Sequence, residues 1–371
     1  MDFHSIFKSI ECSEAIKNSL GSYVSTFSDS VELSEFDLAL FFLPYAGSDK
    51  SDSLGSFVQT FTNLFHHGSN VKILLLGEMI LGATESDTQS GISYVVQELI
   101  SCKVLPVIIG GERNTTMSIY KAFEEMESVV NITAVDPYLN IEGQSGSNYI
   151  GDIVKSQPNY LFNYSNLGFQ TYLVNPNEIQ LSDDLYFDIY RLGELRRNVI
   201  LSEPIIRSTE IFTVSIEAIK NSDFSSAKNP QPNGFYAEEV CQMMRYAGLS
   251  EKLKAVLISD ISNFKNASDE LLVSEMLWCL IDGRSARKHE LPNSRSESFL
   301  KYRVSIQDDE FQLVFYKSLK TDRWWMEVPV PPAYLDKYKK HHLIPCGYED
   351  YQIAVQGDLP DRWWKAYKKM L

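Results

Sequence analysis

Side chains that could do chemistry follow several apolar runs of the chain directly. Four such polar segments occupy residues 110–114, 136–140, 215–219 and 260–263. In open α/β sheets, ligands bind beyond the carboxyl ends of the strands, so side chains at these places are the first candidates for a functional site. Among them, Asp136 and Glu217 are carboxylates that could act as a general base on an amide or amidine.

The elements that must position these side chains are buried strands separated by amphipathic helices. Short, almost wholly apolar runs predict strands at 38–43, 71–76, 104–109, 131–135, 210–216 and 255–260. Apolar residues spaced three and four apart predict helices at 91–101, 115–126, 237–248 and 269–282. Alternation of this kind predicts a three-layer α/β/α fold around a mostly parallel, doubly wound sheet.

The last eighty residues have a different character. Residues 284–298 are polar and loop-like, and the alternating runs 301–306 and 312–317 flank a turn signal at 307–310, which predicts a β-hairpin. We therefore predict two units, an α/β domain at 1–290 and a small C-terminal extension at 291–371. The extension contains the tetrapeptide Asp-Arg-Trp-Trp twice, at 322–325 and at 361–364.

Composition excludes several classes of protein. The chain has 49 acidic and 34 basic residues in 371, a net charge of −15, which disfavours nucleic-acid binding. The longest apolar runs are strand-sized, so we predict no membrane span. Five scattered cysteines without a CxxC pair, and an N-terminus without a signal sequence, predict a cytoplasmic protein. The sequence leaves homo-oligomerisation open.

The four strand-end segments together resemble motifs of the arginase (ureohydrolase) superfamily, in particular its formimidoylglutamase-like branch. In that family, a Gly-Gly turn supplies a histidine ligand, two Asp-rich motifs supply further ligands to two manganese ions, and a later glutamate serves the substrate. A Pro- and Gly-rich loop at 230–239 also resembles the family. The resemblance runs over roughly residues 30–285 and implies the arginase-like fold.

This sequence departs from the family pattern at most ligand positions. Asp136 is retained, and the other positions of the resulting degenerate metal site hold, in chain order, Arg113, Tyr138, Asn140, Glu217 and Ile219. Asn263 stands where the family has its substrate-side glutamate. Two neighbouring divalent cations need several anionic and imidazole ligands. Because most of the ligand positions implied by the resemblance hold other residues, we expect that the manganese site is lost and that no cofactor binds.

The leading expectation is therefore a protein that is not an enzyme, a pseudoenzyme acting as a scaffold or protein-binding module, with room for residual activity. The type of tail resembles arginase-like chains of Bacteroidota, and this resemblance implies an association with gliding motility and type IX secretion. Two alternatives stay open. One is a metal-independent or altered-specificity hydrolase of amidine or amide C–N bonds, and the other is a sensor that binds a small metabolite.

Two further expectations concern particular side chains. We predict that Arg113 donates charged hydrogen bonds to Asp136, Glu217 or both, and that its proximity lowers the pKa of these carboxyl groups. We also expect a protein partner of unknown identity, because tryptophan is enriched at interaction hot spots. Its candidate contacts are Trp324, Trp325, Trp363 and Trp364, which alternatively pack on the chain's own body.

Overall fold

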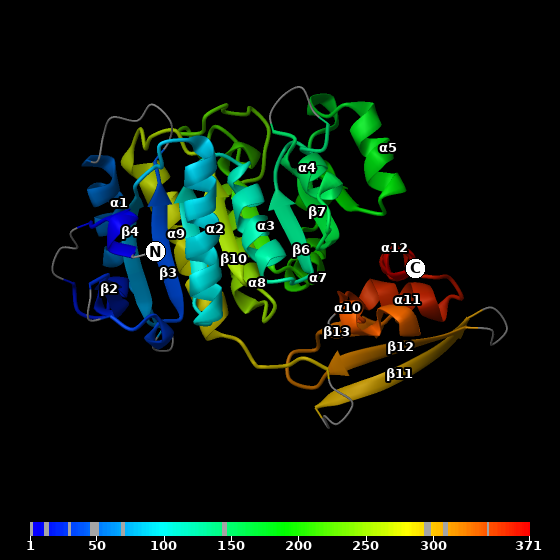
Figure 1. The fold of residues 1–371 in the computed structure, drawn as a ribbon. Helices are drawn as coiled ribbons and strands as arrows, with labels where there is room; N and C mark the ends of the chain where they lie inside the picture. The colour runs from blue at the N-terminus through cyan, green and yellow to red at the C-terminus, as the bar shows by residue number, and fades with distance from the viewer. Residues whose placement is uncertain are drawn as a thin grey trace.

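A mostly parallel sheet runs through the centre of the molecule (Figure 1). The computed structural model describes residues 3–10, 15–28, 31–44, 52–67, 71–142, 147–292, 298–306, 311–339 and 341–371. In this part of the chain, ten strands form one sheet in the order β1-β4-β3-β5-β10-β9-β6-β7-β8, with β2 also paired to β4. The pairing of β1 with β4 is antiparallel and the other pairings in this sheet are parallel.

The strands of this sheet and their bounds are β1 Phe7–Lys8, β2 Val24–Thr26, β3 Leu38–Leu43, β4 Ile73–Met79, β5 Leu105–Gly110, β6 Val130–Val135, β7 Leu161–Phe169, β8 Asp188–Arg191, β9 Ile211–Ser215 and β10 Ala255–Ser259. All six predicted strands are confirmed, within two or three residues at their ends. The helices of the same region are α1 Asp52–Asn63, α2 Glu85–Ser101, α3 Thr115–Glu125, α4 Tyr149–Lys155, α5 Pro176–Asp184, α6 Leu192–Arg197, α7 Ser202–Arg207, α8 Ala237–Leu249 and α9 Ala267–Ser285.

Each face of the sheet is covered by helices, which gives three layers. Side chains of β3 alternate between two separate cores, because successive residues of a strand point to opposite faces. Leu38, Leu40 and Phe42 pack in the core that includes α1, α8 and α9. The intervening residues of β3 pack in the core that includes α2, α3 and α4. Figure 1 shows α2 and α3 on the face nearer the viewer.

Sequence analysis did not predict β7 and β8, which extend the sheet beyond β6. The inner part of β7 is buried, yet it carries Asn163, Ser165 and Asn166. Each of these side chains takes part in a hydrogen bond; Nδ2 of Asn163 donates to Ser165, and Nδ2 of Asn166 donates to the carbonyl of Tyr138 at 2.8 Å. A strand whose buried positions are polar does not present the apolar run by which the other strands were found.

The C-terminal extension forms a second sheet with its own core. Four antiparallel strands follow in the order β11 Phe299–Ile306, β12 Phe311–Ser318, β13 Trp324–Glu327 and β14 Leu343–Cys346. Helices α10 Leu335–Tyr338, α11 Tyr348–Val355 and α12 Asp361–Met370 accompany this sheet (Figure 1). The predicted hairpin is thus β11 and β12, while its predicted turn at 307–310 lies outside the described residues.

The extension contacts the α/β body through specific pairs of residues. The ring of Phe162, on β7, stacks on His341 at 4.5 Å between centroids. Arg323 forms an ion pair with Glu203 of α7, with 3.2 Å between Nε and Oε1. The division at residue 290 stays a prediction. Within the described residues, no helix combines the length and apolar character needed to cross a bilayer.

Candidate functional site

A Gly-Gly turn after β5 directs Arg113 along the carboxyl edge of the sheet. Gly110 and Gly111 have φ values of +95° and +68°, a backbone region that residues with a side chain rarely adopt. A Cβ atom on Gly110 would lie 2.3 Å from the carbonyl oxygen of Leu43, so only glycine fits beside β3 there. The chain then reaches Arg113 just before α3 begins at Thr115.

Arg113 meets three carboxylates that come from the ends of neighbouring strands. Its Nη1 donates to Oδ1 of Asp136 at 2.7 Å, and its Nη2 donates to Glu217. Its Nε lies 3.2 Å from Oδ2 of Asp260, which follows β10. Because β5, β10, β9 and β6 are adjacent in the sheet, their ends bring these side chains together. The prediction that Arg113 binds Asp136 and Glu217 is confirmed.

Each carboxylate has further hydrogen-bond donors from its surroundings. Asp136 accepts from the backbone N–H of Tyr138 at 2.8 Å and from Nδ2 of Asn140 at 3.1 Å. Asp260 accepts a hydrogen bond from Ser215 Oγ at 2.6 Å. Glu217 accepts two from Asn229, one from its backbone N–H at 3.0 Å and one from its Nδ2 at 2.8 Å. Tyr138 and Asn140, two of the predicted degenerate metal-site positions, therefore donate hydrogen bonds to Asp136.

The charges of this cluster are not balanced. Arg113 is 7% exposed, and the three carboxylates are 2% exposed or less, so three acidic groups share one guanidinium away from water. Burial raises the pKa of Asp136 to about 7, although Arg113 acts in the opposite direction. Burial raises the pKa of Glu217 as well. Arg113 does lower the pKa of both carboxyl groups, as predicted, but loss of hydration outweighs the ion pair, so the net shift of each pKa is upward.

Two residues of the cluster adopt strained backbone conformations. Asn140 and Asp260 have φ values of +59° and +65°, in the left-handed region. Asn and Asp tolerate this region better than other side chains, yet such residues concentrate at functional sites. In both cases the conformation presents a side chain to the Arg113 cluster.

Tyr138 and part of the loop before α8 cover the cluster. The Tyr138 ring lies over the guanidinium of Arg113, 4.9 Å from ring centroid to Cζ. Gln231 Nε2 lies 3.4 Å from the Tyr138 hydroxyl, and Asn229 binds Glu217 from the same loop. The cluster is thus closed from the solvent side by residues that hold one another.

A pocket of about 430 Å³ opens at the same edge of the sheet, between the beginnings of α2 and α3. Gly111, Glu112 and Asn114, the neighbours of Arg113 in the chain, line it together with Glu85. Among the residues that line this pocket, there is no Lys, Arg or His. Glu112 is paired with Lys228 at 2.7 Å.

The remaining predicted site residues lie elsewhere. Ile219 is 1% exposed and belongs to the apolar core, and Asn263 is exposed to solvent. Ser215 and Asp260 lie in the candidate segments 215–219 and 260–263 but were given no role there, and Asn229 was not among the candidates. Asp260 carried a signal, since it ends the predicted strand 255–260, but its role required the order of strands in the sheet.

Three of the four predicted partner-binding tryptophans are buried in the chain. Trp324 stacks on Tyr351 at 4.9 Å, and Trp363 donates its indole N–H to the carbonyl of Glu327 at 2.8 Å. Trp325 is 2% exposed and lies under the guanidinium of Arg207 at 4.4 Å. Trp364 is 39% exposed, so of the four it alone presents a large open ring.

The carboxylates of the cluster are the kind of side chain that binds a divalent metal ion, but they are not arranged around a metal position. Within the described residues, no group of three or more His, Cys, Asp or Glu side chains is placed to hold a metal ion. The carboxylates of the cluster bind Arg113 instead, and its guanidinium lies among them. As placed, these residues do not fit a metal ion, although this arrangement does not show that a metal site is lost.

Comparison with known proteins identifies the fold. No family model and no curated protein matches the chain. Among solved structures, a Trypanosoma cruzi formiminoglutamase with Mn²⁺ is 16% identical, with a TM-score of 0.60 over 70% of this chain and 97% of that one. Formimidoylglutamase from Bacillus subtilis is 12% identical, with a TM-score of 0.62 over 77% of this chain and 98% of that one. Agmatine ureohydrolase of Thermoplasma volcanium is 15% identical, with a TM-score of 0.56 over 72% of this chain and 94% of that one.

These similarities correct two expectations. The expectation that the chain is not an enzyme is contradicted, because the structures it resembles are hydrolases and nothing in the described residues is a sign of lost activity. The expectation that it needs no cofactor is contradicted as well, since the similar formiminoglutamase holds Mn²⁺. The chain has the arginase-like α/β fold of formiminoglutamase and agmatine ureohydrolase, with an added antiparallel sheet of four strands.

Proposed function

We propose that this chain hydrolyses a C–N bond of a small amidine or guanidine compound at the carboxyl edge of its large sheet. The observation that carries the proposal is the convergence of Asp136, Glu217 and Asp260 on Arg113. Paired, hydrogen-bonded carboxyl groups at adjoining strand ends, with strained backbone at two positions, are typical of a reaction site.

Asp136 is the group that moves the proton in this proposal. Its Oδ1 is fixed by Arg113 and by the backbone of Tyr138, while Oδ2 accepts one bond, from Asn140. Oδ2 therefore has a lone pair for the proton of an attacking water. A carboxyl group with a pKa of about 7 both takes and returns a proton at neutral pH. Water adds to the amidine carbon, the C–N bond breaks, and the proton passes to the leaving nitrogen.

The adjoining pocket supports the choice of substrate class. The carboxylates of Glu85 and Glu112 belong to its lining, and none of the described residues that line it is basic. Amidinium and guanidinium groups are cations, and a cleft with acidic walls attracts them. Glu112 is shared with Lys228, so Glu85 carries the larger part of this attraction.

Access to Asp136 requires the covering residues to move. Tyr138, Asn229 and Gln231 close the cluster through a ring face and a few hydrogen bonds, two of which join Asn229 to Glu217. Such contacts are weak enough to open without unfolding the sheet. Closure over a bound substrate then excludes water other than the attacking molecule.

The test is turnover of agmatine, arginine and formimidoylglutamate by the purified chain, with and without added manganese. Release of urea, ammonia or formamide is expected, and Asp136→Asn should reduce it at least about a hundredfold, the usual contribution of a positioned acid-base group. Asp322→Asn, at an exposed position in the extension, is the matched control. Absence of turnover across a wider amidine and guanidine panel contradicts the proposal, and binding without turnover replaces it by the metabolite-sensor alternative.

A second proposal concerns a protein partner, because α12 presents Trp364 beside cations. The Nζ atom of Lys368 lies 4.6 Å from the centre of the Trp364 ring, and both belong to the last turns of the chain. An exposed aromatic ring with basic neighbours suits an acidic protein surface. Loss of co-purifying proteins with Trp364→Ala, and not with Tyr172→Ala at another exposed ring, tests this role.

Finer expectations rest on resemblance to known families alone. One is that the chain is of the type found in Bacteroidota, and another is that its metal-site positions are degenerate. The third is an association with gliding motility or type IX secretion. A cytoplasmic location is likewise a prediction from the sequence. Identification of the proteins captured by the full chain in its native cell tests the association and the location together.

A further inference from the structure

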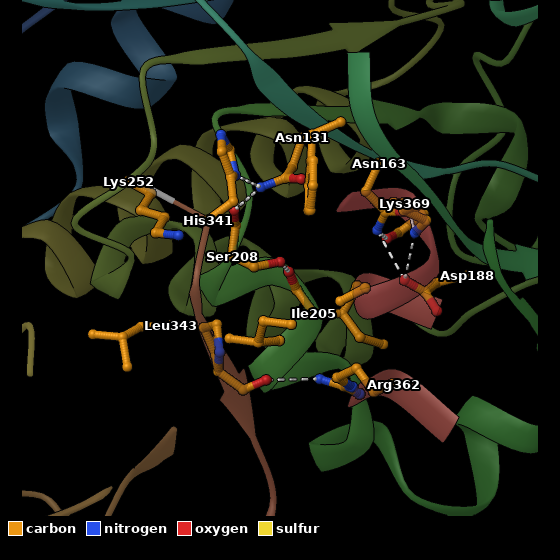
Figure 2. Close-up of a pocket in the computed structure, with 15 residues that line it drawn as sticks. Asn131, Asn163, Asp188, Ile205, Ser208, Lys252, His341, Leu343, Arg362 and Lys369 are labelled. Carbon is orange, nitrogen blue, oxygen red and sulfur yellow. Dashed lines mark hydrogen bonds and ion pairs between the residues drawn. The ribbon is translucent and has the colours of Figure 1, made fainter. Parts of the chain in front are cut away.

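A small cavity lies on the seam between the α/β body and the C-terminal extension, far along the strands from the Arg113 cluster. Its volume is about 40 Å³, enough for a few water molecules or one small ion. The body contributes the amino-terminal parts of β6, β7 and β8 through Asn131, Asn163 and Asp188. The extension contributes β14 and α12 (Figure 2).

Cations outnumber anions among the residues that line this cavity. Lys252, Arg362 and Lys369 line it, together with the imidazole of His341, and Asp188 is the one carboxylate among them. In Figure 2 these side chains surround the hollow from the body and from the extension. Beyond the lining, Lys365 adds a positive charge, and Glu210, Asp350 and Asp361 add negative ones, so the excess of positive charge belongs to the lining of the cavity itself.

The carboxylate of Asp188 is already engaged and does not neutralise this excess. It accepts a hydrogen bond from Nδ2 of Asn163 at 2.8 Å, and it lies 3.7 Å from Lys365 Nζ and 3.9 Å from Lys369 Nζ. These ion-pair distances are long, and two ammonium groups share one carboxylate. The Nζ atom of Lys369 donates a hydrogen bond to the neutral oxygen Oδ1 of Asn163.

The ammonium groups of Lys369 and Lys252 are buried where the extension packs against the body. The Lys369 side chain is 9% exposed, and burial lowers its pKa to about 8. Burial lowers the pKa of Lys252 too, with Glu210 acting in the opposite direction. The negative charge beside the buried Lys369 ammonium compensates it only in part, and an anion next to it would restore the balance.

We infer that this cavity is a binding site for a small oxyanion of the size of inorganic phosphate or sulfate. Ammonium and guanidinium groups are the usual partners of such anions. Asn131, Ser208 and Asn163 line the same space as neutral polar groups, and their side-chain hydrogens are donated to other acceptors, so the cations are the groups that face an anion there. Since the lining comes from both parts of the chain, a bound oxyanion holds the extension on the body. This inference does not depend on the proposed hydrolytic function.

The experiment measures phosphate binding to the full chain by equilibrium dialysis, and the melting temperature with phosphate or sulfate against chloride at equal ionic strength. Binding near one ion per chain and a higher melting temperature are expected. Lys369→Met should weaken binding at least tenfold, whereas Lys368→Met, one residue away on α12 and outside the cavity, should leave it unchanged.

Other outcomes decide against the site. Absence of phosphate and sulfate binding to the unmodified chain at millimolar concentration overturns the inference without any variant. Equal losses in Lys368→Met and Lys369→Met indicate general attraction to α12 and also overturn it. Should Lys369→Met fail to fold, Lys252→Met, on the body side of the cavity, provides the same comparison.

Discussion

The guanidinium of Arg113 donates to Oδ1 of Asp136 at 2.7 Å, and this bond ties the turn after β5 to the end of β6. Two strands, β10 and β9, lie between β5 and β6 in the sheet. Arg113 also binds the carboxylates that follow those two strands, Asp260 and Glu217. One side chain therefore connects four adjacent strand ends and lowers the repulsion among three buried acids.

The first prediction is that Arg113→Met destabilises the fold strongly. Three buried carboxylates lose their common cation, and breaking a buried ion pair costs about 3–5 kcal/mol of unfolding free energy. Urea unfolding at pH 7 measures the loss. Arg196→Met is the matched control, because its 3.7 Å pair with Glu239 is partly exposed and contributes about 0–1 kcal/mol. Equal effects of the two substitutions would show that the cluster is not held by Arg113.

The second prediction is a pH dependence that originates in Asp136. Its carboxyl group titrates near pH 4 in the unfolded chain, whereas burial raises its pKa to about 7 in the folded chain. Between these values the folded state keeps a proton that the unfolded state has released. The free energy of unfolding therefore falls as pH rises from about 4 to about 7, by up to ~1.4 kcal/mol per pH unit.

Asp136→Asn should flatten this part of the stability profile, measured by urea unfolding at intervals between pH 4 and 8. Some slope should persist, because burial raises the pKa of Glu217 in the same direction. Asp322→Asn is the control, since the Asp322 side chain is 82% exposed. An unchanged profile in Asp136→Asn would mean that Asp136 stays ionised throughout this range.

Much of the large sheet follows from local sequence, because its strands are apolar runs of the right length between amphipathic helices. The runs at β3, β5 and β10 illustrate this, since all their residues are buried. β7 was missed because its buried Asn and Ser residues interrupt the apolar run, and partners of these side chains include residues distant in the sequence, such as Asp188 and Tyr138. Such partners become visible only in the folded chain.

The candidate site was predictable in position and in part in its contacts. The Gly110-Gly111 turn and the retained Asp136 located it, and the charge of Arg113 indicated its partners. The net direction of the pKa shift of Asp136 was not predictable, because it depends on how completely the folded chain removes this carboxyl group from water. The fourth member, Asp260, needed the strand order that places β10 between β5 and β9.

The third prediction concerns the close approach of α8 and α9. A Cβ atom on Gly248 would lie 2.1 Å from the carbonyl oxygen of Leu280 and 3.0 Å from Cα of Gly283. Gly248→Ala must therefore push the helices apart, and we expect a loss of about 1–3 kcal/mol in urea unfolding. Gly55→Ala is the matched control within α1, where a Cβ would meet nothing within 4 Å. That substitution should stabilise the chain by about 0.5–1 kcal/mol.

The last prediction distinguishes the tryptophans of the extension by their packing. Trp325 is 2% exposed, and its ring lies between Phe299 in an edge contact at 5.6 Å and the Arg207 guanidinium of the body at 4.4 Å. Trp325→Ala removes a large buried ring and should lower the free energy of unfolding by about 3–5 kcal/mol. Trp363→Ala should also destabilise, since that ring is 5% exposed.

Trp364→Ala provides the comparison, because its ring is 39% exposed and belongs to the same helix as Trp363. Its replacement should change the unfolding free energy by less than about 1 kcal/mol, as is usual for surface positions. Differential scanning calorimetry of the full chain measures all three variants. If the extension unfolds separately in a first transition, Trp325→Ala should move that transition downward, because it removes a contact with the body as well as one within the extension. A Trp325→Ala chain as stable as Trp364→Ala would show that the two parts do not hold each other through this ring.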